Sequence, residues 1–280
     1  AQERAGGTVT AALGLPVRPA PPPTTAWSEP PMPPPPPPAE PALRAAKLSI
    51  VVPLKDEADG VASLFVELDA VAAALAGRAD CEFVVVDDGS ADRTWELLER
   101  HAAGRPRVRL VRHERNRGVA AAIRTGVLAS EADVVASIDG DLSYDPMELA
   151  AMLPLLAHAD VVTASPYHPR GGVRNVPRWR LFLSRTLSAA YRALLRRDLR
   201  TWTSCFRVYR RRAVVDLPLV HEGFLGTAEL LVRVLRRGGR VVEHPCVLEA
   251  RLLGVSKMRV VRTVFGHLRL LWQVLLGRVR

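Results

Sequence analysis

Short apolar runs alternate with segments of helical periodicity from residue 48 to residue 164, and this alternation limits the possible folds most strongly. The runs predict buried strands at 48–52, 83–86, 108–111, 134–138 and 161–164. Apolar residues at helical spacing follow the first run, and further helices are predicted at 92–101, after 116–118 and from Pro146. Strands that alternate with helices form a mainly parallel sheet with helices on both faces. We therefore predict an α/β fold of this kind.

The remainder of the chain has a different character. Residues 16–41 hold most of the prolines, so residues 1–46 are expected to form a disordered, proline-rich tail. A single domain is predicted for residues 47–257, in which a helix at 178–195, a helix at 222–237 and a strand at 240–249 follow the alternating part. Residues 258–280 are predicted to form a basic amphipathic helix.

Pairs of acidic residues follow three of the predicted strands. They are Asp56 and Glu57, Asp87 and Asp88, and Asp139 and Asp141. In a parallel sheet the carboxyl ends of the strands meet at one edge, which is where ligands bind. Carboxylates that gather at this edge repel one another unless a cation or hydrogen-bond donors offset their charge. The pattern therefore favours a ligand site over a purely structural role.

The segment Asp139-Gly140-Asp141 places two hard oxygen ligands two positions apart at the end of a strand. Such ligands suit Mg²⁺ or Mn²⁺ that is held jointly with the phosphates of a substrate. A cation there would offset the charge that builds up on a departing nucleoside diphosphate. The alternative is an ordinary solvated turn, because two aspartates at this spacing are common by chance.

Several functional classes are disfavoured. The chain has neither a GxGxxG segment after the first strand nor a GxxxxGK[ST] segment, which argues against a dinucleotide fold and a P-loop. Its three cysteines are far apart and form no CxxC pair, so the sequence suggests no zinc site and no disulfide framework. The net charge of +10 suits nucleic acid or an anionic membrane, but aromatic residues make up only 5% and form no stacking platform. No nucleic-acid partner is expected.

Six short segments lie at residues 51–57, 85–90, 116–118, 139–142 (with Pro146), 203–209 and 251–257. In sequence and in order they resemble the motifs of family 2 glycosyltransferases of the GT-A fold, and especially the polyprenol- or dolichol-phosphate mannosyltransferases. The resemblance covers about residues 47–258. The chain departs from the family pattern within these segments, since Ser143 replaces a common glutamine and Cys205 a usual glycine. The resemblance therefore does not fix the sugar or the acceptor.

The resemblance implies a nucleotide-sugar donor, either GDP-mannose or a UDP-sugar, and Mg²⁺ or Mn²⁺ bound by Asp139 and Asp141. The nucleotide-binding residues that it implies are Pro53, Asp56, Glu57, Asp87, Asp88, Asn116, Gly118 and Asp139. The candidate contacts to the acceptor or its phosphate are Arg170, Arg180, Arg185, Arg207, Ser256 and Lys257. Arginines bind phosphate through paired hydrogen bonds, which suits a lipid phosphate.

The expected reaction is an inverting transfer, in which the acceptor attacks the anomeric carbon opposite the leaving nucleoside diphosphate. A polyprenyl phosphate is already anionic near neutral pH, whereas an alcohol acceptor needs a carboxylate such as Glu229 to take its proton. A salt bridge to an arginine is the other role considered for Glu229. The rival functions are transfer to a soluble or polysaccharide hydroxyl, nucleotidyl transfer, and a non-catalytic basic module that binds membranes.

The C-terminal segment has an apolar stripe at helical spacing with arginines among and after it. The stripe consists of Val261, Val264, Phe265, Leu268, Leu271, Trp272 and Leu275. Such a helix lies in a membrane interface or packs on its own domain with the arginines in solvent. No apolar run reaches the roughly 18 residues of a membrane-spanning helix. We therefore expect a cytoplasmic enzyme that is peripheral on the inner face of the membrane.

Overall fold

The structure is a computed structural model that describes residues 46–249 and 260–279. The predicted proline-rich tail, except for its last residue, lies outside the described residues, and so do Ser256 and Lys257. All of the described residues belong to one compact unit.

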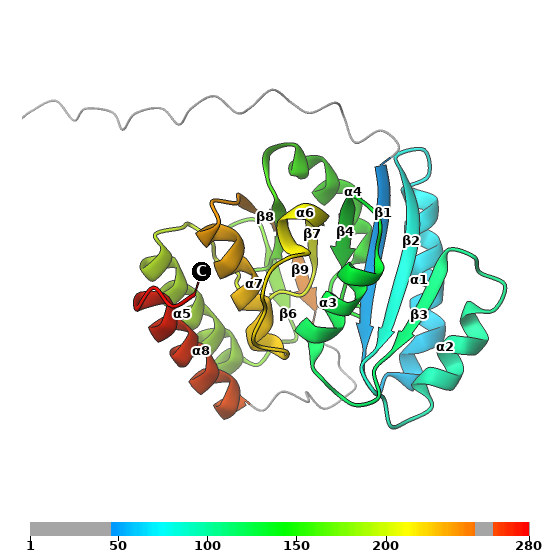
Figure 1. Cartoon of the computed structure of the whole chain (residues 1–280), viewed down its shortest axis with the longest axis horizontal. Coiled ribbons are helices and arrows are strands. Elements are labelled where there is room, and N and C mark those ends of the chain that lie inside the picture. Colours follow the sequence, from blue (N-terminus) through cyan, green and yellow to red (C-terminus); the bar gives the residue numbers. More distant parts are fainter. Residues whose placement is uncertain (1–45, 250–259, 280) are drawn as a thin grey trace, which may run out of the picture. The chain divides into compact units, whose positions relative to one another are not determined.

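A seven-stranded sheet is built in the order β3-β2-β1-β4-β7-β5-β8 (Figure 1). Its strands are β1 (Ala46–Leu54), β2 (Ala79–Asp87), β3 (Val108–Arg112), β4 (Val134–Ser137), β5 (Val161–Ser165), β7 (Arg207–Arg210) and β8 (Val241–Pro245). Neighbouring strands are parallel except at β7, which runs antiparallel to both β4 and β5. A separate parallel pair consists of β6 (Gly172–Arg174) and β9 (Val247–Glu249).

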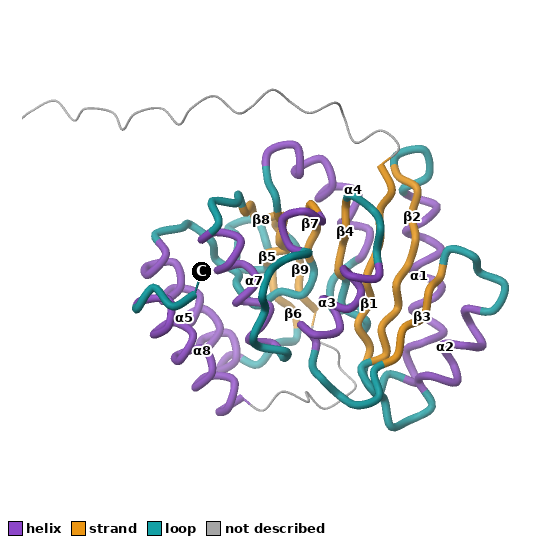
Figure 2. Tube along the Cα trace, in the orientation of Figure 1, coloured by secondary structure: helices purple, strands orange, loops and turns teal. Residues whose placement is uncertain are grey.

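Helices cover both faces of the seven-stranded sheet (Figure 2). One face packs against α1 (Val61–Ala74), α2 (Thr94–Ala102) and α4 (Leu149–Met152), and the other against α3 (Val119–Ala129), α6 (Arg211–Val214) and α7 (Phe224–Arg236). Short 3-10 helices are η1 (Ala58–Gly60), η2 (Pro146–Glu148) and η3 (Leu153–His158). The long helix α5 (Arg178–Leu195) contacts α8 (Val260–Leu275), which also packs on α7.

The apolar run of β1 shows why the strands read as continuous hydrophobic segments. Ile50 and Val52 belong to the core on the α1 side, whereas Val51 between them belongs to the core on the α3 side. Successive side chains of a strand point to opposite faces, so a strand that is covered on both sides must be apolar at every position. This is the pattern from which the sheet was predicted.

The predicted α/β architecture is confirmed, with differences in detail that include the short strand β6, which was not predicted. The sequence analysis did not predict β7, because Arg207-Val208-Tyr209-Arg210 is short and has an arginine at each end. The strand expected at 240–249 is two strands, β8 and β9, which belong to different sheets. The sheet is therefore mainly parallel with one antiparallel strand near its middle.

Candidate active site

The carboxyl ends of β1, β2 and β4 meet at one edge of the sheet. The backbone N–H of Asp88 donates to the oxygen of Leu54 (2.8 Å), which ties the end of β2 to the end of β1. Gly140 packs against the same end of β1, since a Cβ at this position would lie 2.7 Å from the Pro53 oxygen and would overlap the Leu54 side chain. Only glycine allows this approach, so the turn that follows β4 lies directly beside the first strand.

Hydrogen bonds join the loop after β1 to the loop after β2. Asp56, with a φ of 51°, donates its backbone N–H to Ser90 Oγ (2.8 Å) and accepts at Oδ1 from the Ala91 N–H (2.8 Å). Lys55 Nζ donates to Asp56 Oδ1 (2.8 Å) and to the oxygen of Gly89 (3.0 Å). The loops that carry the first two acidic pairs are thus joined, and Lys55 offsets part of the negative charge through its ion pair with Asp56.

Asp87 and Glu57 are anchored in different ways. Asp87 is fully buried at the end of β2, and its Oδ1 accepts from the Ser90 N–H (3.0 Å). Its Oδ2 lies 3.2 Å from Arg112 Nε, close enough for an ion pair, although no hydrogen bond of good geometry reaches it from the described residues. Glu57 is partly exposed, and its backbone N–H donates to Thr94 Oγ1 (2.8 Å).

Asp88 holds the loop that carries Asn116 and Gly118. Its Oδ1 accepts from the backbone N–H of Arg117 (2.8 Å) and contacts His113 Nδ1 (2.7 Å), and its Oδ2 accepts from the N–H of Gly118 (2.6 Å). Both oxygens are engaged and the residue is 3% exposed, so Asp88 acts on the predicted nucleotide site by positioning this loop. Asn116, by contrast, is exposed on the loop that Asp88 positions.

Asp88→Asn is expected to lower both the melting temperature and the affinity for nucleoside diphosphates. The amide group has only one acceptor atom, so its NH₂ would face a backbone N–H of Arg117 or Gly118. An unsatisfied buried donor costs about 1–3 kcal/mol. Thermal unfolding and calorimetric titration with GDP and UDP measure the two effects. Asp59→Asn, at an exposed position in η1, is the control and should change neither. An unchanged melting temperature in Asp88→Asn would contradict this role.

Asp139 has a carboxylate oxygen that the protein does not satisfy. The residue is half-buried, but its Oδ2 has no accessible surface and no hydrogen-bond partner among the described residues. Burial and the neighbouring charge of Asp141 raise the pKa of Asp139 to about 7, against smaller opposing effects of Cys205 and Arg207. Asp141 Oδ1 accepts from both the N–H (3.0 Å) and the hydroxyl (2.6 Å) of Ser143.

These residues fit a divalent cation. Two adjacent carboxylates with a nearby hydroxyl are the hard oxygen donors that Mg²⁺ and Mn²⁺ prefer. A cation beside Asp139 would satisfy its Oδ2 and would offset the repulsion from Asp141 that raises its pKa. Asp139 and Asp141 therefore remain the candidate metal ligands.

The segment around β7 supports Asp139 from within the protein. The thiol of Cys205, which is 2% exposed, is hydrogen-bonded to Asp139. Arg207 is 1% exposed, and its guanidinium donates to the backbone oxygens of Thr227 (2.7 Å) and Trp202 (2.8 Å). The burial of Arg207 and the bonds that its Nε, Nη1 and Nη2 donate inside the protein disfavour the predicted contact with an acceptor phosphate. The charge of Arg207 instead favours the ionised form of Asp139.

Glu229, on α7, is a buried structural carboxylate. It is 1% exposed, and its oxygens contact Arg233 Nε (2.7 Å) and His221 Nδ1 (2.8 Å) and accept from the backbone N–H groups of Val220 and His221. Burial alone would raise its pKa, but the hydrogen bonds from His221, Arg233 and Val220 together lower it to about 2. A general base needs access and a pKa near the working pH. The proposed base role is therefore corrected in favour of the salt bridge to Arg233.

One of the three candidate phosphate-binding arginines of the region 170–185 lines a cavity. The cavity has a volume of about 150 Å³ and is lined by Tyr167, Arg185, Ser188, Ala189, Arg192, Leu199 and Arg200. Arg185 also stacks over Tyr167, with 5.5 Å between the guanidinium carbon and the ring centroid. Arg170 is exposed and Arg180 stacks on Trp179, and neither lines this cavity. The structure thus groups Arg185 with Arg192 and Arg200.

Arg112 and His113, which hold the acidic pair at the end of β2, were not predicted. Arg112 is the register partner of Asp87 across β2 and β3, and His113 follows it. A basic residue at the end of one strand and an acidic residue at the end of its neighbour form a usable signal only after the strand pairing is known. The sequence alone does not provide that pairing.

Comparisons with known protein sequences identify the family. A sequence profile for "Glycosyl transferase family 2" matches residues 49–217, which is more than half of the 280 residues. The dolichol-phosphate mannosyltransferase of Pyrococcus furiosus is 30% identical over 234 residues, covering 82% of this chain and 64% of that protein. The polyprenol monophosphomannose synthase of Mycolicibacterium smegmatis is 37% identical over 183 residues, covering 62% of this chain and 69% of that protein. The chain thus spans about two thirds of the length of these relatives.

A solved structure confirms the fold. The glucosyl-3-phosphoglycerate synthase of Mycobacterium tuberculosis, crystallised with Mn²⁺, UDP and glucosyl-3-phosphoglycerate, matches with a TM-score of 0.59 and 21% identity. The match covers 84% of this chain and 80% of that protein. At this identity the likeness establishes the GT-A fold and not the substrates.

Proposed function

Because the chain belongs to glycosyl transferase family 2, we propose that it transfers a sugar from GDP-mannose or a UDP-sugar to a polyprenyl phosphate, with inversion at the anomeric carbon. The observation that carries the proposal is the pair Asp139 and Asp141 at the carboxyl edge of the sheet, in which Asp139 Oδ2 is buried and has no hydrogen-bond partner within residues 46–249 and 260–279. A sugar donor with a diphosphate and a divalent cation is the ligand that such a pair suits. The names of the relatives, two of which are mannosyltransferases or mannose synthases of lipid phosphates, support the choice of substrates.

The residues of the chain have distinct tasks in this proposal. Mg²⁺ or Mn²⁺, bound by Asp139 and Asp141, would stabilise the negative charge on the leaving nucleoside diphosphate. The loops joined by Lys55 and Asp56 form the floor beneath the nucleotide, and Asp88 positions the exposed Asn116 beside it. Arg207 and Cys205 lie on the interior side of Asp139 and favour its ionised form, against the larger effects of burial and of Asp141.

The state of Glu229 favours a phosphate acceptor over an alcohol. An alcohol must lose its proton during the transfer, and the carboxylate considered for this task is buried in ion pairs with a pKa of about 2. A phosphate monoester is anionic near neutral pH and attacks without a base. The arginine-lined cavity between α5 and the segment 199–200 offers positive charge for such an acceptor, because Arg185, Arg192 and Arg200 all line it.

Helix α8 provides a means of working at a membrane surface. Its packed face includes His267, Leu270 and Val274, each at most 1% exposed. Its other face carries large apolar side chains that are more than half exposed, namely Phe265, Leu268, Trp272 and Leu275. The neighbouring helix α5 exposes Trp179 and Phe182 to a similar degree. One face of α8 therefore packs on the domain, and the other face is apolar and exposed to solvent. The helix thus has a feature of each predicted role, packing on its own domain and entering a membrane interface.

No helix of the described part of the chain has the length and hydropathy needed to cross a bilayer. We propose that the exposed faces of α8 and α5 enter the interface of an anionic membrane instead. Exposed arginines on the C-terminal segment, Arg269 and Arg278, add attraction of roughly 1 kcal/mol each near anionic lipid. The site would then lie where a polyprenyl phosphate emerges from the bilayer.

The triple change of Phe265, Leu268 and Trp272 to serine is expected to release the protein from anionic vesicles. Each apolar side chain contributes about 1.5–3 kcal/mol when it is buried, so the loss of three should weaken binding by more than roughly 100-fold. Vesicle sedimentation at low salt measures the effect, and binding of the unchanged protein should fall as salt rises. Hydrolysis of the soluble donor should be spared.

The double change of Val66 and Leu128 to serine is a matched control, because these exposed apolar residues lie on α1 and α3. It should leave vesicle binding unchanged. Because the triple variant spares the packed face of α8, its melting temperature should also be unchanged. A folded triple variant that still sediments with vesicles, or that uses lipid acceptor as well as before, would contradict the membrane proposal.

A competition between acceptors tests the proposed substrate class. Release of nucleoside diphosphate should be much faster with polyprenyl phosphate than with sugars, glycerol or the matching polyprenol, which lacks the phosphate. Arg185→Gln should raise the KM for polyprenyl phosphate and leave the KM for the donor unchanged. Faster turnover with a hydroxyl acceptor would favour a soluble or polysaccharide acceptor and would reject the lipid phosphate.

A further inference from the structure

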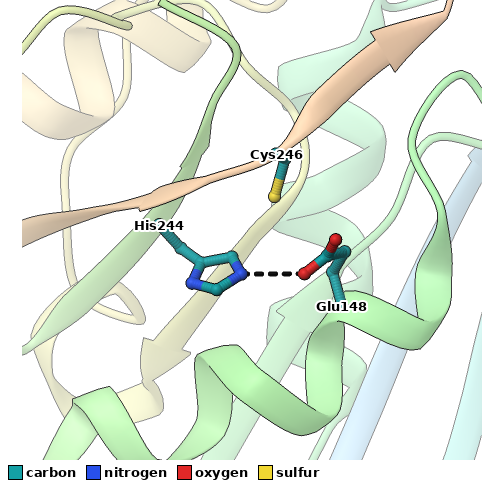
Figure 3. Close-up of side chains that lie close together, drawn as sticks. All are labelled: Glu148, His244 and Cys246. Carbon is teal, nitrogen blue, oxygen red and sulfur yellow. Dashed lines mark hydrogen bonds and ion pairs between the residues drawn. The ribbon is translucent and has the colours of Figure 1, made fainter. Parts of the chain in front are cut away.

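Glu148, His244 and Cys246 form a cluster of potential metal ligands that lies apart from the aspartate pair in sequence (Figure 3). One carboxylate oxygen, one imidazole nitrogen and one sulfur, all from these residues, lie within 4.8 Å of one another. His244 Nε2 is 2.8 Å from Glu148 Oε2, and the sulfur of Cys246 points towards this pair. Glu148 ends η2, His244 belongs to β8 and Cys246 follows that strand. Sequence spacing cannot reveal the cluster, because Glu148 and His244 are 96 positions apart.

We propose that this cluster binds Zn²⁺ or a divalent cation with similar ligand preferences, distinct from the cation expected at Asp139 and Asp141. Cysteine sulfur, histidine nitrogen and a carboxylate oxygen are the three ligand types that Zn²⁺ takes in proteins. The soft sulfur selects against Mg²⁺ and Mn²⁺, which prefer oxygen. Three protein ligands leave a fourth tetrahedral position for water or another ligand.

The observed separations are near those of a bound site. Zinc bonds of about 2.0–2.3 Å place tetrahedral ligand atoms about 3.3–3.6 Å apart. His244 and Glu148 would have to open slightly from 2.8 Å, and the sulfur, which lies within 4.8 Å of both, would have to close by no more than about 1 Å. Glu148 is only partly buried, so its side chain can make most of this adjustment.

Binding of a cation changes the protonation of the ligands. A cysteine side chain is ordinarily a thiol near neutral pH when no metal binds it, whereas the metal ligand is the thiolate. Binding forms one metal–sulfur bond and releases the thiol proton to solvent. The hydrogen bond between His244 Nε2 and Glu148 Oε2 is replaced by a bond from each of these atoms to the cation. The proton of that hydrogen bond passes through solvent to His244 Nδ1, so that the imidazole binds the cation as a neutral ring.

A cation bound here would link the segment that follows Asp139 and Asp141 to strand β8, at the edge of the sheet. Glu148 follows that pair by seven positions, and β8 is the last strand of the seven. The segment after the aspartate pair is also joined to β9, because the N–H of Glu249 donates to the oxygen of Ser143 (2.9 Å). The proposal does not depend on the proposed function, since it concerns binding alone.

Cobalt titration of the full chain, after removal of bound metal with a chelator, tests the proposal. Co²⁺ bound by a thiolate gives a charge-transfer band in the near ultraviolet, which a site of oxygen ligands does not. We expect this band to saturate at one equivalent and to disappear when Zn²⁺ is added. Cys246→Ser should abolish it, and His244→Gln and Glu148→Gln should each weaken cobalt binding by about tenfold or more.

The other two cysteines provide the controls. Cys81→Ser and Cys205→Ser should keep the band, because Cys81 lies in β2 and Cys205 lies beside Asp139. Absence of the band in the unchanged protein would overturn the proposal. So would its loss in Cys205→Ser with retention in Cys246→Ser, since the thiolate would then belong to the aspartate site. If Cys246→Ser does not fold, full cobalt affinity in folded His244→Gln overturns it equally.

Discussion

Asp141→Ala is expected to reduce sugar transfer by roughly 10³-fold or more, because a metal ion supplies several kcal/mol of transition-state stabilisation and each 1.36 kcal/mol is a factor of ten. The fold should survive, since Asp141 is partly exposed at the edge of the sheet and accepts hydrogen bonds from Ser143, which is only two positions away. The measurement is the release of nucleoside diphosphate in the presence of Mn²⁺, together with the melting temperature.

Two comparisons make this result specific. EDTA should reduce the activity of the unchanged protein to a similar degree, and added Mn²⁺ should restore it. Asp59→Ala removes a carboxylate from an exposed position in η1 and should keep full activity. Activity of Asp141→Ala near that of the unchanged protein would remove Asp141 from the metal site, and so would full activity in EDTA.

Glu229→Ala is expected to lower the free energy of unfolding by about 3–5 kcal/mol, the range found when one partner of a buried ion pair is removed. The change leaves Arg233, 8% exposed, without its partner in the core around α7. Urea denaturation measures the loss. Glu222→Ala is a matched control, because Glu222 forms an exposed ion pair with Arg117 and should contribute less than about 1 kcal/mol. Equal effects of the two changes would contradict the structural role of Glu229.

The same residue gives a defined pH dependence. The pKa of Glu229 is about 2 in the folded protein and about 4.5 for the free side chain. A lowered folded pKa means that the contribution to stability is fully present above about pH 4.5 and is lost as the pH falls towards about 2. Glu229→Gln should therefore show a flatter stability profile over this window. An unaltered slope would show that other groups cause the acid unfolding.

Local sequence patterns predicted most of the sheet, because its strands are buried on both sides. Ile50, Val51 and Val52 are all fully buried, and such a run cannot be accommodated in an exposed loop. The pattern failed at β7, whose arginines Arg207 and Arg210 look like surface residues. Arg207 is buried because the backbone oxygens of Thr227 and Trp202 accept hydrogen bonds from it. The pattern of apolar and polar residues along the chain does not reveal these partners. Long-range hydrogen bonds of this kind leave no local signal.

The site was predictable in position but only partly in detail. Acidic residues after strands located the edge of the sheet, since strand ends in a parallel sheet converge. The roles of individual side chains depended on partners in other elements. Asp88 is occupied by the N–H groups of Arg117 and Gly118, and Glu229 by His221 and Arg233. The types of residue suggest the chemistry of a site. Whether a given side chain is free to contact a substrate depends on its hydrogen-bond partners in the folded protein.

Transfer of a radiolabelled sugar into lipid tests directly whether the protein glycosylates a polyprenyl phosphate. The full chain is incubated with Mn²⁺ and polyprenyl phosphate, and labelled GDP-mannose and UDP-sugars are supplied in separate reactions. We predict that label from one of these donors enters an organic-extractable sugar phospholipid in step with release of the nucleoside diphosphate, and that both stop without the divalent cation. If the folded protein neither transfers label nor releases nucleoside diphosphate from any of these donors, with lipid phosphate and Mn²⁺ present, the account is contradicted.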